Sequence, residues 1–354
     1  MSWTGIKSIV RFAQNTEPVK PIYGDIWYKP EDNNSFLYNG NEWLPIRGTP
    51  TIHWGPGSDY GYKAGGYGRG TTIERITFPF NSGTATQVGD LNDTAATYKS
   101  GCNSSTYGYV FAVGTMYGSL INRFEFPFGS GTASQVGNIN NSARMAASCN
   151  SSNYGFTMGG EPVNDQMKSY IERISFPHTS CSATVKGNLS VTTRFSTGCN
   201  SSNYGYTCGG MGLLGTMSII DRITFPFDSG NSSNVGSLNT SLFGASSFNS
   251  SEHGFVCGGT SAPIRSYINR FIFPFDSGTA SNVGNLSQSK YYFQGCNSSI
   301  YGYIFQGYTG SYFTTIDRIT FPFDSGTASY VGNMNYTTYG FAAIDGVDFV
   351  TQFI

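Results

Sequence analysis

The sequence predicts an all-β fold of the β-propeller class, and three observations support this prediction. One phrase recurs six times along the chain at intervals of 48 to 50 residues. Each repeat holds short runs rich in Tyr, Phe, Ile, Val and Thr, separated by Gly, Asn, Ser and Asp, which is the pattern of strands and turns. No repeat has helical periodicity, and a period of about 40 to 50 residues is that of one four-stranded propeller blade.

The recurring phrase, Ile-x-Arg-(Ile/Phe)-x-Phe-Pro and close variants, is the predicted third strand of each repeat. In residues 220–227, alternation places Ile223, Phe225 and Phe227 on one face, and we expect this face to pack between adjacent blades. An Asp-Ser-Gly turn follows in several repeats. Acidic residues precede four of the recurring arginines, and we expect acids and arginines to pair in a ring that braces the blades. The arginines are Arg75, Arg123, Arg173, Arg222, Arg270 and Arg318, and the acids are Glu74, Glu172, Asp221 and Asp317.

Four of the seven cysteines occupy one position of a repeated (Gly/Ser)-Cys-Asn-Ser-Ser phrase: Cys102, Cys149, Cys199 and Cys296. Equivalent positions in successive blades are too far apart for a disulfide. We therefore expect a small buried residue in a strand at this position. The asparagine that follows each cysteine is interpreted as a turn residue and not as a glycosylation site.

Two blade counts fit the sequence. Third strands number six, but residues 339–354 resemble the first two strands of another blade and residues 35–46 resemble a third and fourth strand. The 354 residues less roughly 20 leave about 334, which is about seven periods of 48. We therefore expect seven four-stranded blades, six complete and one composite, in which 22–50 pair with 337–354 and close the ring. Residues 1–21 would be an attachment tail and 22–354 the propeller. The alternative is six blades plus an N-terminal hairpin.

The strand order in residues 142–189 resembles the kelch repeat. There SARMAASCNSSNYGFTMGG is followed by IERISF and TVKGNL. A kelch unit likewise runs from a first strand, through a strand that ends in Gly-Gly, to a third and a fourth. The repeat departs from kelch in ending its third strand with Phe-Pro and in lacking the tryptophan of strand four. The resemblance implies a kelch-like propeller.

The N-terminal segment resembles a phrase common near the start of tail-fibre and other virion proteins of tailed bacteriophages. Its residues are Gly24 to Tyr28, Leu37 to Gly40, and Glu42-Trp43. Repeats such as TTIDRITFPFDSGTASYVGNM (314–334) are similar to repeats of phage structural proteins. The resemblance implies a virion protein, made in the bacterial cytoplasm, in a tail fibre or tail tip. Its N-terminus would dock on other virion proteins, and its propeller would recognise a glycan or protein of the host surface. A capsid or tail decoration or spacer is the alternative.

Composition and motifs argue against other functions. A net charge of −1 gives no electrostatic reason to expect nucleic acid or an anionic membrane as partner, and no run of about 20 apolar residues predicts a membrane span. The histidines, His53, His178 and His253, occupy different repeat positions, and no catalytic or metal-binding motif occurs. We expect no catalytic residue, cofactor or metal, with a kelch-type enzyme as the third hypothesis. Homo-oligomerisation stays open.

The loops after Gly-Gly differ most between repeats and are the candidate binding surface, because binding residues concentrate on loops that a rigid scaffold positions. The alternative is that these loops differ because nothing constrains them. Tyrosine combines a large apolar ring with a hydroxyl, which suits it to contact glycans or protein loops. The candidate binding residues are Tyr117, Tyr170, Tyr267, Tyr308 and Tyr312.

Overall fold

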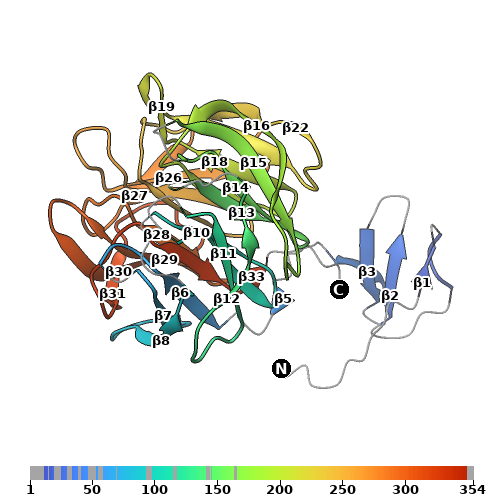
Figure 1. Ribbon diagram of the computed structural model, residues 1–354. Helices are drawn as coiled ribbons and strands as arrows, with labels where there is room; N and C mark the ends of the chain where they lie inside the picture. The colour runs from blue at the N-terminus through green and yellow to red at the C-terminus, as the bar shows by residue number, and fades with distance from the viewer. Residues whose placement is uncertain are drawn as a thin grey trace. The chain divides into compact units, whose positions relative to one another are not determined.

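The computed structural model describes residues 12–14, 16–19, 25–29, 34–38, 41–46, 53–54, 59–68, 70–92, 98–114, 118–140, 144, 146–162 and 166–348. The chain divides into two compact units. Unit 1 comprises residues 1–53 with 349–354, and unit 2 comprises residues 54–348. Every regular element of the described residues is a β-strand (Figure 1).

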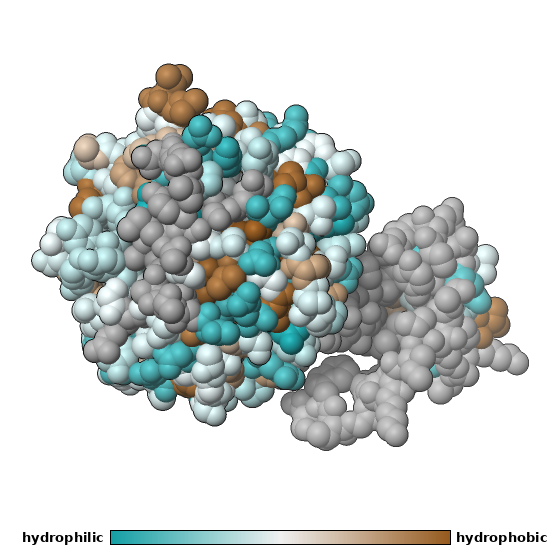
Figure 2. All heavy atoms as spheres, in the orientation of Figure 1, coloured by the Kyte–Doolittle hydropathy of each residue, from teal (hydrophilic) through white to brown (hydrophobic). Residues whose placement is uncertain are grey.

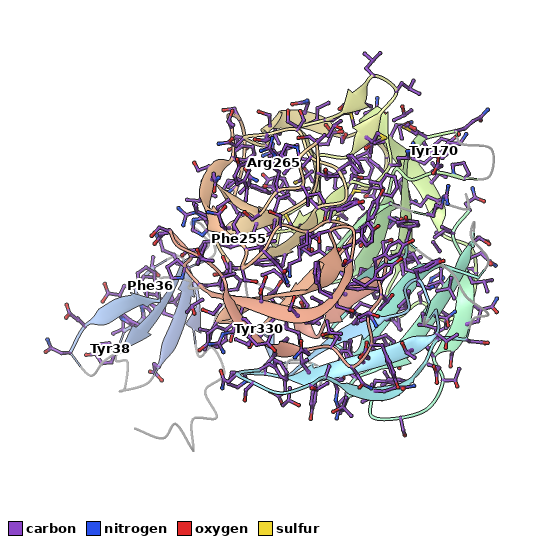
Figure 3. The ribbon with its side chains drawn as sticks, turned by 90° about the vertical axis from the view of Figure 1, so that its left-hand side faces the viewer. Phe36, Tyr38, Tyr170, Phe255, Arg265 and Tyr330 are labelled. Carbon is purple, nitrogen blue, oxygen red and sulfur yellow. The ribbon has the colours of Figure 1, made fainter. Side chains whose placement is uncertain are left out.

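Unit 1 contains one small sheet with the strand order β1 (Phe12–Ala13), β2 (Ile26–Lys29), β3 (Asn34–Tyr38), β4 (Trp43–Ile46). Trp27 stacks on Phe36 with ring centroids 4.7 Å apart and meets Trp43 edge-on at 5.6 Å. The indole of Trp27 also donates a hydrogen bond to the carbonyl of Gln14 at 2.8 Å. The aromatic N-terminal phrase therefore builds a sheet of its own, which carries Phe36 and Tyr38 in Figure 3.

Unit 2 consists of six four-stranded antiparallel blades, which we number in chain order. The strands of each blade are given from the first to the fourth. Blade 1 is β32 (Ala342–Asp345), β6 (Tyr60–Ala64), β7 (Thr72–Thr77) and β8 (Thr86–Asp90); blade 2 is β9 (Ser100–Asn103), β10 (Tyr107–Val113), β11 (Leu120–Glu125) and β12 (Ser134–Asn138); blade 3 is β13 (Ala147–Asn150), β14 (Tyr154–Met158), β15 (Lys168–Ser175) and β16 (Thr184–Thr193). Blade 4 is β17 (Thr197–Asn200), β18 (Tyr204–Cys208), β21 (Ile219–Thr224) and β23 (Ser233–Ser237); blade 5 is β24 (Ser246–Asn249), β25 (His253–Cys257), β26 (Tyr267–Ile272) and β27 (Ser281–Asn285); blade 6 is β28 (Gln294–Asn297), β29 (Tyr301–Tyr308), β30 (Tyr312–Thr320) and β31 (Ser329–Asn333).

Three further pairings complete the strand list. β22 (Gly230–Asn231) pairs in parallel with β16, β19 (Met211–Gly212) forms a hairpin with β20 (Gly215–Thr216), and β5 (His53–Trp54) pairs with β33 (Val347–Asp348).

The six blades form a closed ring. A parallel bridge or pair of strands joins the fourth strand of each blade to the turn before the fourth strand of the next blade. This series begins with Asp90 and Thr132 and returns to blade 1 through Asn333 and Thr84. The first strands also contact one another in a closed cycle. The first strands therefore surround the axis of the propeller.

The predicted propeller is confirmed, with the six blades of the alternative and not the preferred seven. The preferred count paired 22–50 with 337–354, whereas in the structure the C-terminal β32 pairs with β6. Blade 1 already has three strands between Tyr60 and Asp90, so it lacks only the first strand, which β32 supplies. The strands within 35–46 lie in the sheet of unit 1, where the alternative expected a hairpin. Dividing the length by the period counted those strands as half a blade.

The predicted packing of the third strand between blades is confirmed. Ile223 and Phe227 of blade 4 lie in one buried cluster with Cys149 and Phe156 of blade 3, and Phe225 packs against this cluster. The four repeated cysteines are buried, as expected. A Cβ atom added to Gly155 would lie 2.5 Å from the Sγ atom of Cys102 in the preceding blade. The glycine of the second strand therefore makes room for the cysteine of the neighbouring blade.

The expected ring, in which these four acids pair with the recurring arginines, is wrong, because neighbouring residues in a strand point to opposite faces. The arginines bond to the following blade, as Arg75 does to the carbonyl of Phe128 at 3.1 Å. Three of them also pair with the Asp of the Asp-Ser-Gly turn there. The acids face the preceding blade, where the backbone N–H of Ser190 donates to Asp221 at 2.7 Å.

The repeated asparagines end the first strands, and they are more than turn residues. In four of them, Asn150, Asn200, Asn249 and Asn297, the Oδ1 atom accepts a hydrogen bond from the backbone N–H of the equivalent residue in the preceding blade, as Asn150 does from Asn103 at 3.4 Å. Asp345 takes this place in blade 1 and accepts from Asn297 at 2.8 Å. We call this end of the propeller the turn face, and the opposite end, which carries the Gly-Gly loops, the loop face.

Candidate functional site

The candidate site is the centre of the loop face, where five of the six blades place a described residue four positions before the buried first-strand residue. In three blades this residue is a bulky aromatic in left-handed backbone: Tyr98 (φ 63°), Phe195 (φ 55°) and Tyr292 (φ 58°). Gly244 and Gly340 occupy the same position in two others, with φ of 63° and 65°. This conformation suits glycine and costs a bulky residue about 1 to 3 kcal/mol. The repeated fold therefore sets the backbone conformation at this position, and in three blades a bulky ring occupies it although the conformation is strained.

The three rings pack against one another over the axis. Tyr98 meets Phe195 at 5.4 Å and Tyr292 at 5.3 Å between ring centroids, and Phe195 lies 4.9 Å from Tyr292. The recess that they line has a volume of about 30 Å³, which has room for about one water molecule. The rings thus form a floor, and a larger ligand would lie on the loop face and not inside the ring.

A second ring of residues lies one position earlier in the chain and pairs with the first residue after Gly-Gly, or after Gln306-Gly307 in blade 6. Antiparallel bridges join Arg144 to Glu161, Arg194 to Met211, Phe243 to Thr260, and Tyr291 to Tyr308. Tyr339 takes the position in blade 1, where its carbonyl accepts the N–H of Tyr67 at 3.0 Å. These pairs differ from blade to blade while the surrounding frame repeats. They therefore divide the centre of the loop face into two chemically distinct halves.

Blades 5, 6 and 1 supply the aromatic half, defined as Tyr67, Phe243, Tyr291, Tyr308, Tyr312 and Tyr339. Tyr312 stacks on Tyr339 with an interplanar angle of 7° and a centroid separation of 5.7 Å, and Tyr67 stacks on Tyr339 at 5.1 Å. Tyr67 is 52% exposed and Tyr312 47%. Burial raises the pKa of Tyr339 and of Tyr291, so both keep neutral hydroxyls, which can donate and accept hydrogen bonds at pH 7.

Blades 3 and 4 supply the charged half, which consists of Arg144, Glu161 and Arg194. The Nη2 atom of Arg144 lies 3.1 Å from the Oε2 atom of Glu161, and the Nη1 atom of Arg194 pairs with its Oε1 atom. The carboxylate is fully buried, and it is held between two cations as a buried charge requires. The guanidinium of Arg194 lies 5.6 Å from the ring centre of Phe195, which connects this half to the axial floor.

The predicted tyrosines separate into three groups. Tyr308 and Tyr312 belong to the aromatic half. Tyr170 and Tyr267 lie at one position of the third strand, half-buried, where Tyr170 contacts Lys168 and Tyr267 contacts Arg265. Figure 3 labels Tyr170 and Arg265. Tyr117 lies outside the described residues.

Sequence reasoning did not find the residues just before the first strands, among them Tyr98, Phe195, Tyr292, Arg144 and Arg194. The prediction considered only the loops after Gly-Gly, whereas the connections between blades supply the other residues at the centre of the loop face. A comparison of the residue four positions before the buried first-strand residue of each repeat would have found the axial set, since that position is aromatic in three repeats, glycine in two and methionine in one.

An apolar groove of about 460 Å³ lies at the β19–β20 hairpin, lined by Val191, Met217 and Ile219 among others. Leu213 and Leu214 are exposed at the tip of this hairpin, and Figure 2 shows a hydrophobic projection there. The groove offers mainly apolar surface and few polar groups to orient a ligand.

The histidines and acids do not gather into a site in the part of the chain that the structure describes. His178 is buried between blades, where other repeats have phenylalanine, and His253 lies in the second strand of blade 5. No group of three or more His, Cys, Asp or Glu side chains is placed to hold a metal ion among the described residues. Within the same residues, no helix is long and apolar enough to cross a membrane.

Comparison with protein-family models and with curated proteins found no match to this sequence.

Proposed function

We propose that this chain is a virion component of a tailed bacteriophage whose loop face recognises a glycan on the host surface. The virion assignment is supported by the resemblance of the N-terminal phrase and of the repeats to those of phage structural proteins. The choice of face is supported by one observation above all. Three bulky aromatic residues at the axis occupy left-handed backbone at a position that two other blades fill with glycine.

The aromatic half suits a carbohydrate because stacked tyrosine rings offer flat apolar surface together with hydroxyl groups. Tyr67, Tyr312 and Tyr339 are held by stacking on one another, so few side-chain rotamers would be lost on binding. Backbone bonds fix the loop bases as well, for example the mutual N–H to carbonyl bonds of Tyr291 and Tyr308 at 3.2 and 3.1 Å. A pre-organised aromatic surface on a closed ring is a property of a recognition module.

The test is binding of the full chain to an array of bacterial surface glycans, followed by measurement of phage adsorption in the presence of the purified chain. We expect a glycan to bind and the chain to compete with the phage. Tyr312→Ala and Tyr67→Ala should each weaken binding about tenfold, which corresponds to about 1.4 kcal/mol. The matched control is Tyr330→Ala, because Tyr330, labelled in Figure 3, is 56% exposed but lies on β31 opposite Asp317 and does not belong to the aromatic half.

Two outcomes would contradict the proposal. If no glycan binds and adsorption is unaffected, the propeller is a spacer or decoration. If glycan binding survives the loss of Tyr67 and Tyr312 but not that of Tyr330, recognition occurs on another surface. Mass spectrometry of purified virions tests the virion assignment separately.

A further inference from the structure

We propose that the glycan is acidic, with its carboxylate or phosphate bound at the charged half by Arg144 and Arg194. This inference rests on the proposed function and specifies its ligand. The two arginines occupy the same repeat position in neighbouring blades, while blades 5, 6 and 1 place aromatic residues there. The loop face therefore places a cationic group beside a stacking surface, which complement the anionic group and the flat C–H face that an acidic sugar presents together.

The charged half carries an excess of positive charge. Two guanidinium groups share the single carboxylate of Glu161, which leaves a net charge of one. The other ion-paired lysines near the loop face add nothing to this excess, because Lys63 pairs with Glu74 and Lys290 pairs with Asp317, all four fully buried. Lys99 lines the axial recess, where its Nζ atom donates to the carbonyl of Gly70 at 3.3 Å. The centre of the loop face is thus cationic among the described residues.

Arg194 has N–H donors that are not used by hydrogen bonds within the described part of the protein. A guanidinium carries five N–H donors, and the contacts of Arg194 with Glu161 and with the Sδ atom of Met211, at 3.6 Å, use two of them. Its Nε atom is buried and has no hydrogen-bond partner in the structure. The side chain is 25% exposed, whereas Glu161 is fully buried. An incoming anion therefore meets the arginine and not the carboxylate, and planar guanidinium groups suit carboxylate and phosphate oxygens.

The geometry favours a sugar over an acidic peptide. Phe195 lies under the guanidinium of Arg194 at 5.6 Å and beside Tyr292 at 4.9 Å, so the cation and the aromatic surface are continuous. Phe243 of the aromatic half lies 5.7 Å from Phe195, so a ligand that stacks on the aromatic half extends toward Arg194. An acidic peptide would need only the charges, and it would bind without the tyrosines.

The experiment uses the full chain and an array of matched pairs. Each pair is a uronate- or phosphate-bearing oligosaccharide and its carboxyl-reduced or dephosphorylated form, and a polyglutamate peptide is included. The acidic member should bind at least tenfold more tightly, since a charge-assisted hydrogen bond strengthens binding by about that factor or more. Whether carboxyl or phosphate pairs show the preference identifies the anion.

Three variants test the assignment to this site. Arg194→Gln should reduce the preference for the acidic member about tenfold and leave the neutral member unaffected. Glu161→Gln should change the preference in the opposite direction, because it adds one positive charge to the face. Lys168→Gln is the matched control, since it removes a cation of blade 3 that lies beside Gln166 and Tyr170 and not at the charged half, and it should change nothing.

Arg194→Gln alone leaves Glu161 with one partner fewer and risks misfolding. The double variant Arg194→Gln with Glu161→Gln removes both charges, and it should fold and lose the preference. If both members of each pair bind equally and Tyr312→Ala still abolishes binding, the glycan function stands and the acidic ligand is refuted. If no member of any pair binds, both proposals fail. Equal binding of the polyglutamate peptide, unaffected by Tyr312→Ala, would also overturn the acidic-sugar proposal.

Discussion

The Nη1 atom of Arg318 in blade 6 lies 3.2 Å from the carbonyl oxygen of Phe80 in blade 1, across 238 positions of sequence. The N–H of the same Phe80 donates a hydrogen bond to the Tyr303 hydroxyl of blade 6 at 2.9 Å. These two bonds join the last blade to the first. The same pair of bonds links other neighbouring blades, as Arg123 and Tyr109 show with His178 at 3.0 Å each.

Tyr303→Phe should lower the free energy of unfolding by about 1 to 3 kcal/mol, because it leaves the buried N–H of Phe80 without this acceptor. The change is otherwise conservative, since Phe156 and Phe255 occupy the same position in blades 3 and 5, and Phe255 is labelled inside the propeller in Figure 3. The urea midpoint of the full chain measures the effect.

The reciprocal variant Phe255→Tyr is the control for Tyr303→Phe. It adds a hydroxyl where the next blade offers the N–H of Phe323, the equivalent of Phe80, so it should leave stability equal or higher. A loss as large as that of Tyr303→Phe would show that ring packing, and not the hydrogen bond, decides stability at this position.

Gly155→Ala should destabilise the propeller by about 1 to 3 kcal/mol, the usual cost of overpacking a core. Its new Cβ atom would lie 2.5 Å from the Sγ atom of Cys102. The backbone of Gly155 is not left-handed, so the effect is steric contact and not a strained φ.

A double-mutant cycle separates the contact from other causes. Cys102→Ala removes the sulfur, so the double variant Gly155→Ala with Cys102→Ala should recover part of the loss. Strictly additive effects would mean that the two positions do not interact.

The sequence predicted the frame because every blade repeats it. The arginine of the third strand recurs six times and the Gly-Gly pair four times, both at regular positions of the repeat, so the observations from separate repeats supported one another. The preferred number of blades was wrong, because Trp43 and its neighbours form strands like those of a blade but lie in the sheet of unit 1. Strand pattern does not tell which sheet a strand joins.

The candidate site was predicted only in part, because a site differs from the repeat that carries it. Tyr308 and Tyr312 were found through the divergence of one loop. Phe195 and Arg194 lie in a connection whose length and turns gave no signal, and a left-handed φ at Phe195 is not readable from a single residue type. The division into an aromatic and a charged half requires the closed ring, which brings residues of separate repeats to one axis.

One thiol should react in the folded protein. Of the seven cysteines, Cys181 is exposed and the other six are buried. Burial raises the pKa of the Cys102, Cys149 and Cys296 thiols well above the usual range, and only the thiolate is a good nucleophile.

Titration with a thiol reagent at pH 8 should therefore modify about one cysteine in the native chain and all seven after unfolding in urea. Cys181→Ser should bring the native value to zero. Rapid modification of two or more thiols in the native Cys181→Ser variant would contradict the burial of the repeated cysteines.

Stability should fall in mild acid because of His178. Burial between blades lowers the pKa of this imidazole from its ordinary value of 6.5, and the charge of Arg123 adds to the effect. The folded chain therefore binds this proton more weakly than the unfolded chain does. The stabilisation is fully present above pH 6.5 and is lost as the pH falls through the lower folded pKa.

His178→Phe should reduce this acid sensitivity, since Phe80, Phe128, Phe227, Phe275 and Phe323 fill the equivalent position in the other blades. His253 has a pKa lowered in the same direction, by burial first and by Arg270 second, so its contribution has to be separated. Tyrosine occupies the position of His253 in the other five blades, which makes His253→Tyr the matched second variant. The urea midpoint measured between pH 5 and pH 8 should become flatter in each variant and flattest in the double variant. An unchanged slope in His178→Phe would mean that the pKa of this imidazole is the same in the folded and the unfolded chain, and it would contradict the prediction.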